Sequence, residues 1–246
     1  MSRLLLRKML KRMGLLEPLR AVKRRFYHRP NEFKPADPRL LISTIACLNW
    51  LNEHGALEGS DVIEFGIFRG FNVWFTHAYS RVLGVNDVRF FGFDSFFGIP
   101  PTTGIDADGT FKEGEFSAYR EEVESFLTRY GVDWSKTFMV EGFFDQTCNA
   151  DTANKYNLRR CSLCIVDADL YSSAKTALAF VEPYLAEHSI LYFDDWNDYL
   201  DDPNKGEPRA FAEFQEEHAK TFSAEPFTDL KKIGGKGTAF IIHRLS

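Results

Sequence analysis

The chain has 246 residues, 44% of them hydrophobic and 26% charged, which fits one α/β domain with its own core. Its formal net charge is -5, yet residues 1–30 contain ten Lys and Arg against one acid, Glu17, so the remaining body is strongly acidic. A body that acidic argues against nucleic-acid binding. No apolar run reaches the roughly 18 residues that a membrane-spanning helix needs.

The four cysteines lack the spacing of a disulfide framework, which indicates reduced thiols and a cytoplasmic protein. Cys161 and Cys164 could suggest zinc or a redox pair. They lie in an apolar run, however, and no second Cys/His pair stands at metal-binding spacing. Buried thiols are therefore the favoured interpretation.

Residues 1–38 are predicted to stand apart from a domain at 39–246. Up to Leu19, apolar residues recur at helical spacing with Arg and Lys on the opposite face, which predicts a basic amphipathic helix before a proline-punctuated linker. The sequence leaves three roles open for residues 1–30. They could dock on the acidic body or on another subunit of a homo-oligomer, contact anionic lipid at the inner face of the membrane, or form a loose tail.

The domain alternates short apolar runs with amphipathic stretches, which is typical of βαβ units. After a first helix through Leu48 and Leu51, strands are predicted at 61–65, 88–93, 137–140, 161–166, 190–193 and 238–243, and helices at 70–83, 121–130, 173–185 and 209–218. The short connection at 233–237 predicts an antiparallel hairpin. The sequence thus predicts a Rossmann-like α/β fold, with a mostly parallel sheet, an antiparallel edge and helices on both faces.

The first two predicted strands end in residues suited to a nucleoside. Glu64 is followed by Gly66 and Gly70, which let the backbone approach a ligand, and by a helix whose first N–H groups are free. Asp94 ends the second strand, where its carboxylate can accept hydrogen bonds from two ribose hydroxyls. Either feature alone also fits an ordinary turn or a helix cap. Together they predict a nucleoside-type ligand without separating NAD from S-adenosylmethionine (SAM).

Acidic residues follow the fourth and fifth predicted strands. Asp167 and Asp169 come after one, and Asp194 and Asp195 after the other. Carboxylates that converge at adjacent strand ends repel one another unless a cation neutralises them, and an all-oxygen set suits Mg²⁺, Mn²⁺ or Ca²⁺. The alternative is that Asp195 or Asp169 merely caps a helix or a turn, and Asp169 is the least certain member of the set.

The segment 95–119 is too long for a plain connection between a strand and a helix. It is rich in Gly, Phe and acids, and it contains Pro100 and Pro101. We expect a lid-like insertion, with a disordered surface insertion as the alternative.

Five stretches form a series of motifs: EFGIFRG at 64–70, GFDSFFGIP at 92–100, EGFFD at 141–145, DADLYSS at 167–173 and FDDW at 193–196. They resemble successive motifs of the macrocin O-methyltransferase family, and the resemblance runs from about Asp61 to Phe214. It implies the seven-stranded class I methyltransferase fold, SAM and Mg²⁺ or Mn²⁺ as cofactors, and methylation of a hydroxyl on a sugar or glycosylated natural product.

The resemblance also implies roles for individual residues. Glu64, Gly66 and Gly70 would flank the methionine part of SAM, Asp94 would hold the ribose, and residues 142–145 would edge the adenine. Asp167, Asp194 and Asp195 would bind the metal. Our own hypothesis, beyond the resemblance, is that Asp167 or Asp169 receives the proton from the acceptor. The full set of residues expected to bind the cofactor SAM is Glu64, Gly66, Phe68, Arg69, Gly70, Asp94, Ser95, Gly142, Phe143, Asp145 and Asp167.

One departure concerns the base. Related catechol-type enzymes place a lysine three residues after the first metal-binding Asp, where this chain has Leu170. Lys175 is nearby, but we expect a solvated helix residue there. Two rivals stay open: a NAD-type sugar-nucleotide enzyme, for which Tyr171 and Lys175 have the spacing of a base pair, and a SAM-binding scaffold without turnover.

Overall fold

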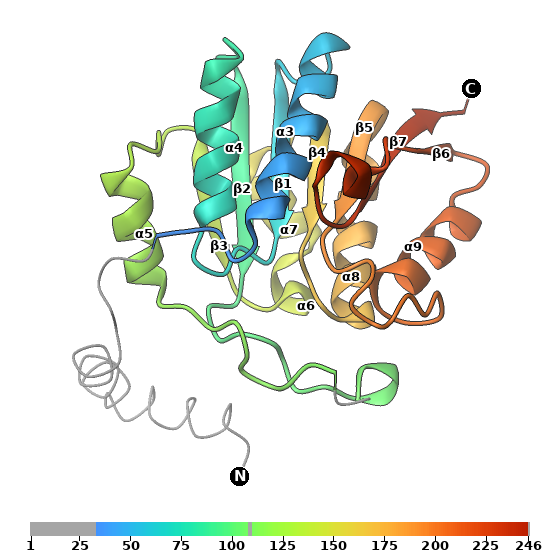
Figure 1. The fold of residues 1–246 in the computed structure, drawn as a ribbon. Helices are drawn as coiled ribbons and strands as arrows, with labels where there is room; N and C mark the ends of the chain where they lie inside the picture. Colours follow the sequence, from blue (N-terminus) through green and yellow to red (C-terminus); the bar gives the residue numbers. More distant parts are fainter. Residues whose placement is uncertain (1–32, 108–109, 246) are drawn as a thin grey trace, which may run out of the picture.

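A computed structural model describes residues 33–107 and 110–245 of the chain (Figure 1). The predicted amphipathic helix and most of the linker lie outside these residues. Within the described ranges, none of the helices combines the length and the apolar character needed to cross a bilayer.

Seven strands form one sheet in the order β3-β2-β1-β4-β5-β7-β6. Neighbouring strands from β3 to β5 run parallel, while β7 is antiparallel to both β5 and β6. This arrangement confirms the predicted mostly parallel sheet with an antiparallel edge hairpin. The strands are β1 (Ser60–Phe65), β2 (Val88–Asp94), β3 (Thr137–Glu141), β4 (Cys161–Val166), β5 (Leu185–Phe193), β6 (Phe222–Pro226) and β7 (Thr238–Arg244).

Helices cover both faces of the sheet because side chains alternate along each strand. Val62 of β1 packs in the cluster that includes Leu48 of the first described helix, whereas its neighbour Ile63 packs in the cluster on the other face. Figure 1 shows α3 and α4 in front of the sheet. The α-helices are α3 (Pro38–Glu53), α4 (Phe71–Val82), α5 (Arg120–Arg129), α6 (Phe144–Thr147), α7 (Ala150–Tyr156), α8 (Tyr171–Val181) and α9 (Gly206–Glu217).

The structure corrects the boundaries of three predicted elements. The helix predicted at 173–185 ends at Val181, because Pro183 lies in the 3₁₀ turn Glu182–Tyr184, and β5 then begins at Leu185 instead of residue 190. Helix α9 begins at Gly206 instead of residue 209, since a proline is tolerated in the first turn of a helix. The short helices α6 and α7 between β3 and β4 were not predicted.

The 95–119 segment is folded onto the body in its described parts. Its two arms pair through backbone hydrogen bonds from Ile99 to Glu115 and from Gly114 to Ile99. Its 3₁₀ turn Gly104–Asp106 carries a carboxylate that accepts hydrogen bonds from the backbone N–H groups of Tyr171 and Ser172 at 2.9 and 3.2 Å. The insertion therefore caps the first turn of α8.

The cysteine prediction is confirmed. Cys47, Cys161 and Cys164 are buried, Cys148 is partly buried, and all four are free. Burial raises the pKa of the Cys47 thiol to about 12, which is typical of an unreactive thiol.

Candidate functional site

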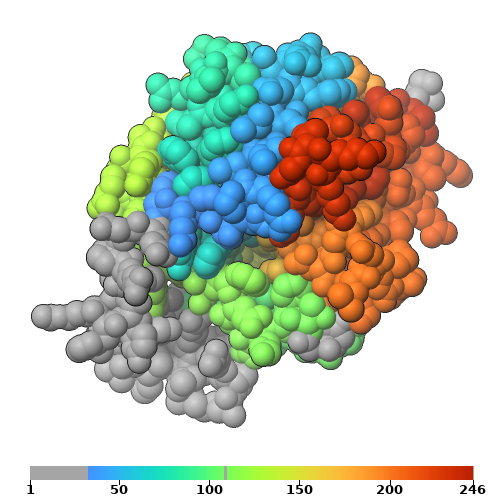
Figure 2. Space-filling view, in the orientation of Figure 1, coloured from blue at the N-terminus to red at the C-terminus, as the bar shows by residue number. Residues whose placement is uncertain are grey.

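A cavity of about 580 Å³ lies at the carboxyl ends of β1, β2, β4 and β5. The insertion closes one side of it, and the segment after β5 closes another. Figure 2 shows these two segments, green and orange, side by side on this face of the molecule. The predicted site residues that line the cavity are Gly66, Phe68, Asp94, Ser95, Phe143, Asp145, Asp167, Asp169, Asp194 and Asp195.

Gly66 makes possible the close contact between the turn after β1 and the end of β4. Its φ is +89°, and a Cβ atom there would lie 1.8 Å from the carbonyl oxygen of Asp167. The sequence suggested that this glycine gives a ligand access to the backbone. The structure gives it a further function, because any side chain would push the turn and Asp167 apart.

Asp94 braces the same turn. Its Oδ2 accepts hydrogen bonds from the backbone N–H groups of Ile67 and Phe68 at 2.9 and 3.0 Å, and its Oδ1 accepts one from Phe96 at 2.6 Å. Burial raises the pKa of the carboxyl, and these three bonds oppose that shift. Oδ2 thus accepts two hydrogen bonds and Oδ1 one, so Oδ1 retains a lone pair that can accept a hydrogen bond from a ribose hydroxyl.

Glu64, Arg69, Gly70 and Gly142 are not among the residues that line the cavity. Glu64 is buried behind the turn, where Oε2 accepts a hydrogen bond from Asn72 Nδ2 at 3.1 Å, and burial raises its pKa to about 8. Gly70 opens α4 with φ +74°, and a Cβ there would lie 2.7 Å from Val123. These four predicted site residues therefore lie outside the cavity lining.

The predicted acids meet at the ends of β4 and β5. Asp167, Asp194 and Asp195 each present an oxygen within 4.8 Å of the others, which fits one small cation. Burial, followed by the charges of Asp194 and Asp195, raises the pKa of Asp167 well above its usual value. A raised pKa of this kind is expected where several carboxylates lie close together and a positive ion neutralises them.

Asp169 lies beside these three acids in an unusual backbone conformation. Its φ is +58°, its N–H donates to Asp195 Oδ2 at 3.1 Å, and its carbonyl accepts a hydrogen bond from Tyr199 at 3.1 Å. Burial, then the charge of Asp198, raises its pKa to about 7. The left-handed conformation places Asp169 in the wall of the cavity.

The sequence reasoning missed Lys236, which reaches the acids from the connection before β7. Its Nζ lies 2.6 Å from Asp194 Oδ2 and 3.4 Å from Asp195 Oδ1. Burial lowers the pKa of this lysine, but the charges of Asp194 and Asp195 outweigh burial and raise it. The available signal was a lysine between two glycines, which was interpreted as a plain hairpin connection.

Two further acids near the cluster were missed. Glu207, at the start of α9, accepts a hydrogen bond from the N–H of Asp195 at 3.0 Å. Its other oxygen is buried without a partner among the described residues, and burial raises its pKa. Asp198 lines the cavity from the segment after β5. Neither comes directly after a predicted strand: Asp198 lies five residues beyond the strand at 190–193, and Glu207 lies at the start of a helix, so the strand-end rule could not find them.

The residues that suggested a NAD-type enzyme lie outside the cavity. Tyr171 Oη and Lys175 Nζ both donate to Glu213 Oε2 at 2.6 Å. Lys175 is 53% exposed, as expected for a solvated helix residue. The pair joins α8 to α9 on the surface instead of facing a ligand.

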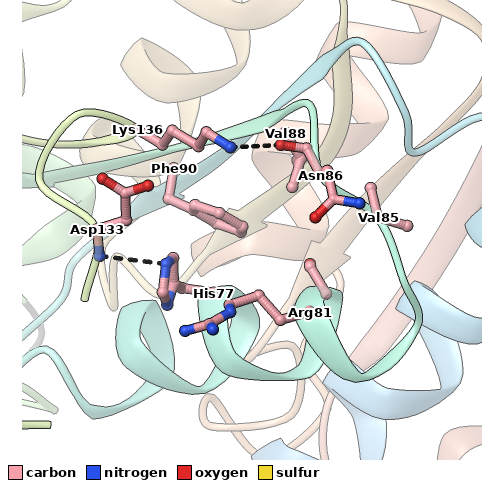
Figure 3. Close-up of a pocket in the computed structure, with 9 residues that line it drawn as sticks. His77, Arg81, Val85, Asn86, Val88, Phe90, Asp133 and Lys136 are labelled. Carbon is pink, nitrogen blue, oxygen red and sulfur yellow. Dashed lines mark hydrogen bonds between the residues drawn. The ribbon is translucent and has the colours of Figure 1, made fainter. Parts of the chain in front are cut away.

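A second cavity, of about 290 Å³, lies at the opposite end of the sheet, near the starts of β2 and β3 (Figure 3). Asp133 donates its backbone N–H to His77 Nε2 there, and Lys136 bonds the carbonyl oxygen of Asn86. None of the predicted site residues lines this cavity. The acids and the glycine turn are gathered in the larger one.

Residues 46–234 match the family model described as macrocin-O-methyltransferase (TylF). The chain belongs to the macrocin O-methyltransferase family. This confirms the resemblance that the five motifs indicated.

A curated relative from Streptomyces olivaceus is the 8-demethyl-8-(2,3-dimethoxy-alpha-L-rhamnosyl)-tetracenomycin-C 4'-O-methyltransferase. It is 27% identical over 143 residues, which is 55% of this chain. The chain spans about half of the relative's length, 52%.

Solved methyltransferases share the fold. The O-methyltransferase NovP superposes with a TM-score of 0.66 at 19% identity, over 87% of this chain and 84% of its own. A calicheamicin methyltransferase gives 0.64 at 24% identity, over 82% and 77%. An apo structure of this same enzyme, CalS11, described as a TDP-rhamnose 3'-O-methyltransferase, gives 0.55 at 23%, again over 82% and 77%. The predicted class I methyltransferase fold is thus confirmed.

Proposed function

We propose that the protein transfers the methyl group of SAM to a sugar hydroxyl, using Mg²⁺ or Mn²⁺ held by Asp167, Asp194 and Asp195. The observation that carries the proposal is the meeting of these three carboxylates in the same cavity as the glycine turn and Asp94. An all-oxygen donor set of this kind suits a hard divalent cation.

The cofactor would lie along the ends of β1, β2 and β3. The turn at Gly66 and Phe68 would bind the methionine part of SAM, with Glu64, Arg69 and Gly70 supporting it from outside the cavity. Asp94 would hold the ribose by accepting a hydroxyl at Oδ1, beside Ser95. Residues 142–145, which lead into α6, would edge the adenine, where aromatic faces such as Phe143 pack well against a purine.

The acceptor hydroxyl must lose its proton as it attacks the methyl group of the sulfonium in line. A bound divalent cation would lower the pKa of that hydroxyl. Asp167, itself a proposed cation ligand, or its neighbour Asp169 would take up the proton, since both line the cavity. Position 170 holds a leucine, and Lys236 stays protonated because Asp194 and Asp195 raise its pKa, so we propose carboxylates as the bases of this site.

We propose a deoxysugar on a glycosylated natural product as the acceptor. The Streptomyces olivaceus relative is named for a rhamnosyl substrate, and one solved neighbour is described as acting on TDP-rhamnose. The far wall of the cavity carries Pro100, Pro101 and Phe116, whose apolar surfaces can pack against a sugar ring.

The test is methyl transfer from SAM to a panel of rhamnosylated aromatic compounds and nucleotide-activated rhamnose. Activity should fall at least about a hundredfold in EDTA, return with Mg²⁺, and stay low in Asp167→Asn. Full turnover in EDTA or in Asp167→Asn would remove the metal from the proposal. SAM binding without turnover on any acceptor would favour the scaffold alternative.

A further inference from the structure

The backbone of Lys236 is fixed against α3. Its N–H donates to Ser43 Oγ at 2.9 Å, and its carbonyl oxygen accepts a hydrogen bond from Ser43 Oγ at 2.7 Å and lies 3.1 Å from Tyr192 Oη. A Cβ at Gly235 would lie 2.5 Å from Ser43 Oγ, and one at Gly237 would lie 2.1 Å from the carbonyl oxygen of Phe193. The two glycines therefore let the loop seat tightly, and the lysine side chain starts from a defined position.

The ammonium group lies among the proposed metal ligands. It contacts both Asp194 and Asp195, whose side chains are each 6% exposed, while the lysine side chain is 20% exposed. Tyr192 Oη donates to the other oxygen of Asp194 at 2.7 Å. Lys236 and Tyr192 thus satisfy both oxygens of Asp194 without any ion.

We propose that Lys236 is a built-in counter-cation that competes with the divalent cation for Asp194 and Asp195 and thereby sets the affinity of the metal site. This inference rests on the proposed metal-dependent function. A divalent ion bound to the same oxygens would stand within a few ångströms of the ammonium, and like charges that close repel strongly in a partly buried site. The lysine side chain must swing away when the ion enters.

The same contacts explain why the acids can stay together before the ion binds. Asp167, Asp194 and Asp195 would repel one another in a buried pocket, and the ammonium reduces that repulsion. Lys236 therefore stabilises the metal-free protein and weakens its affinity for metal, two effects that a neutral side chain would remove together.

The experiment measures how tightly the EDTA-treated full chain binds Mn²⁺. The protein is titrated with Mn²⁺, and the free ion is quantified by electron paramagnetic resonance. A second group of residues, Glu187, His188 and His243, has ligand atoms within 4.8 Å of one another at the surface. The parent protein is therefore the chain with His243→Asn, which removes that competing site, and every variant is made in this parent. Lys236→Met and Lys236→Gln are compared with Lys236→Arg. The matched control is Lys232→Met, which removes an 82% exposed lysine from the same loop.

We expect Lys236→Met and Lys236→Gln to bind Mn²⁺ about tenfold more tightly than the parent, in the range typical of coupled sites. Their melting temperature without metal should fall and should rise more than that of the parent when Mn²⁺ is added. Lys236→Arg, which keeps the charge, and Lys232→Met should bind within about twofold of the parent.

Unchanged or weaker Mn²⁺ binding by both neutral variants would overturn the competition while leaving the metal function in place. Binding by Lys236→Arg as tight as that by Lys236→Met would overturn it as well, because the effect would not be one of charge. A parent that binds no Mn²⁺ would refute the metal-dependent function itself, and the competition with it.

Discussion

The carboxylate of Asp94 accepts a hydrogen bond from the backbone N–H of Ile67 at 2.9 Å, which ties the end of β2 to the turn after β1. The same carboxylate also holds Phe68 and Phe96. One side chain thus shapes the turn that would receive the methionine part of SAM and faces the space proposed for the ribose.

Asp94→Ala should weaken binding of S-adenosylhomocysteine by roughly a hundredfold, because hydrogen bonds to a charged group contribute about 1.5–3 kcal/mol each and several are lost together. Asp94→Asn keeps one acceptor oxygen, so the loss of affinity for S-adenosylhomocysteine should be smaller in this variant. Calorimetric titration measures both. Equal affinity in wild type and Asp94→Ala would show that the residue neither holds the ribose nor shapes the turn.

Gly66→Ala should be strongly destabilising. Its Cβ would lie 1.8 Å from the carbonyl oxygen of Asp167, a backbone atom that cannot yield without moving the end of β4. We expect a loss of at least about 3 kcal/mol in the free energy of unfolding, with weaker Mn²⁺ binding as Asp167 shifts.

The matched control for this change is Gly84→Ala. Gly84 has a similar φ of +78°, but nothing lies within 4 Å of its added Cβ. The control carries the backbone strain alone, about 1 kcal/mol. Urea unfolding compares the two variants, and equal losses would contradict a specific contact between Gly66 and Asp167.

The strand ends were predictable because local pattern and topology agree. The apolar run at 161–166 matches β4 residue for residue, and parallel strands bring Asp94, Asp167 and Asp194 to one edge of the sheet whatever the details of packing. The rule that ligands bind at that edge then locates the site without coordinates.

Lys236 and Asp106 could not be predicted in the same way. The backbone of Lys236 is fixed by Ser43, 193 positions away in the sequence, and Asp106 caps a helix 65 positions away. No periodicity or strand-end rule reports contacts between loops so far apart. The sequence has Leu170 where related catechol-type enzymes have a lysine, and it gives no sign that another loop brings a lysine to the same acids.

Glu64 should make the metal-free protein less stable as the pH rises. Its pKa is about 8 in the folded protein against 4.5 as the ordinary value, so the folded state holds the proton more tightly. The resulting stability is fully present below pH 4.5 and is lost as the pH rises through 8.

Glu64→Gln keeps the shape and an acceptor for Asn72 but removes the titration. The difference in unfolding free energy between wild type and Glu64→Gln should therefore change by up to about 1.4 kcal/mol per pH unit within this window. Glu216→Gln, at an exposed position, is the control and should leave the pH profile unchanged. Parallel profiles for wild type and Glu64→Gln would contradict a raised pKa.

Asp106→Ala should release the 95–119 insertion from α8. The carboxylate of Asp106 is 4% exposed and accepts hydrogen bonds from the N–H groups of Tyr171 and Ser172, which would lose their partner. Removing such a cap costs about 1–2 kcal/mol, so tryptic cleavage after Lys112 should be roughly five to thirty times faster.

If the insertion is a lid, SAM and a sugar acceptor together should slow that cleavage in the wild type more than in the variant. The KM for the acceptor should rise in the variant, while the affinity for SAM stays within about twofold. Asp202→Ala removes a half-buried acid outside the cavity lining that accepts a hydrogen bond from the N–H of Asn204 in the loop after β5, and it should alter neither cleavage nor KM. Equal cleavage rates in wild type and Asp106→Ala would show that the cap does not hold the insertion closed, and cleavage indifferent to both ligands in the wild type would leave it a fixed wall of the cavity instead of a lid.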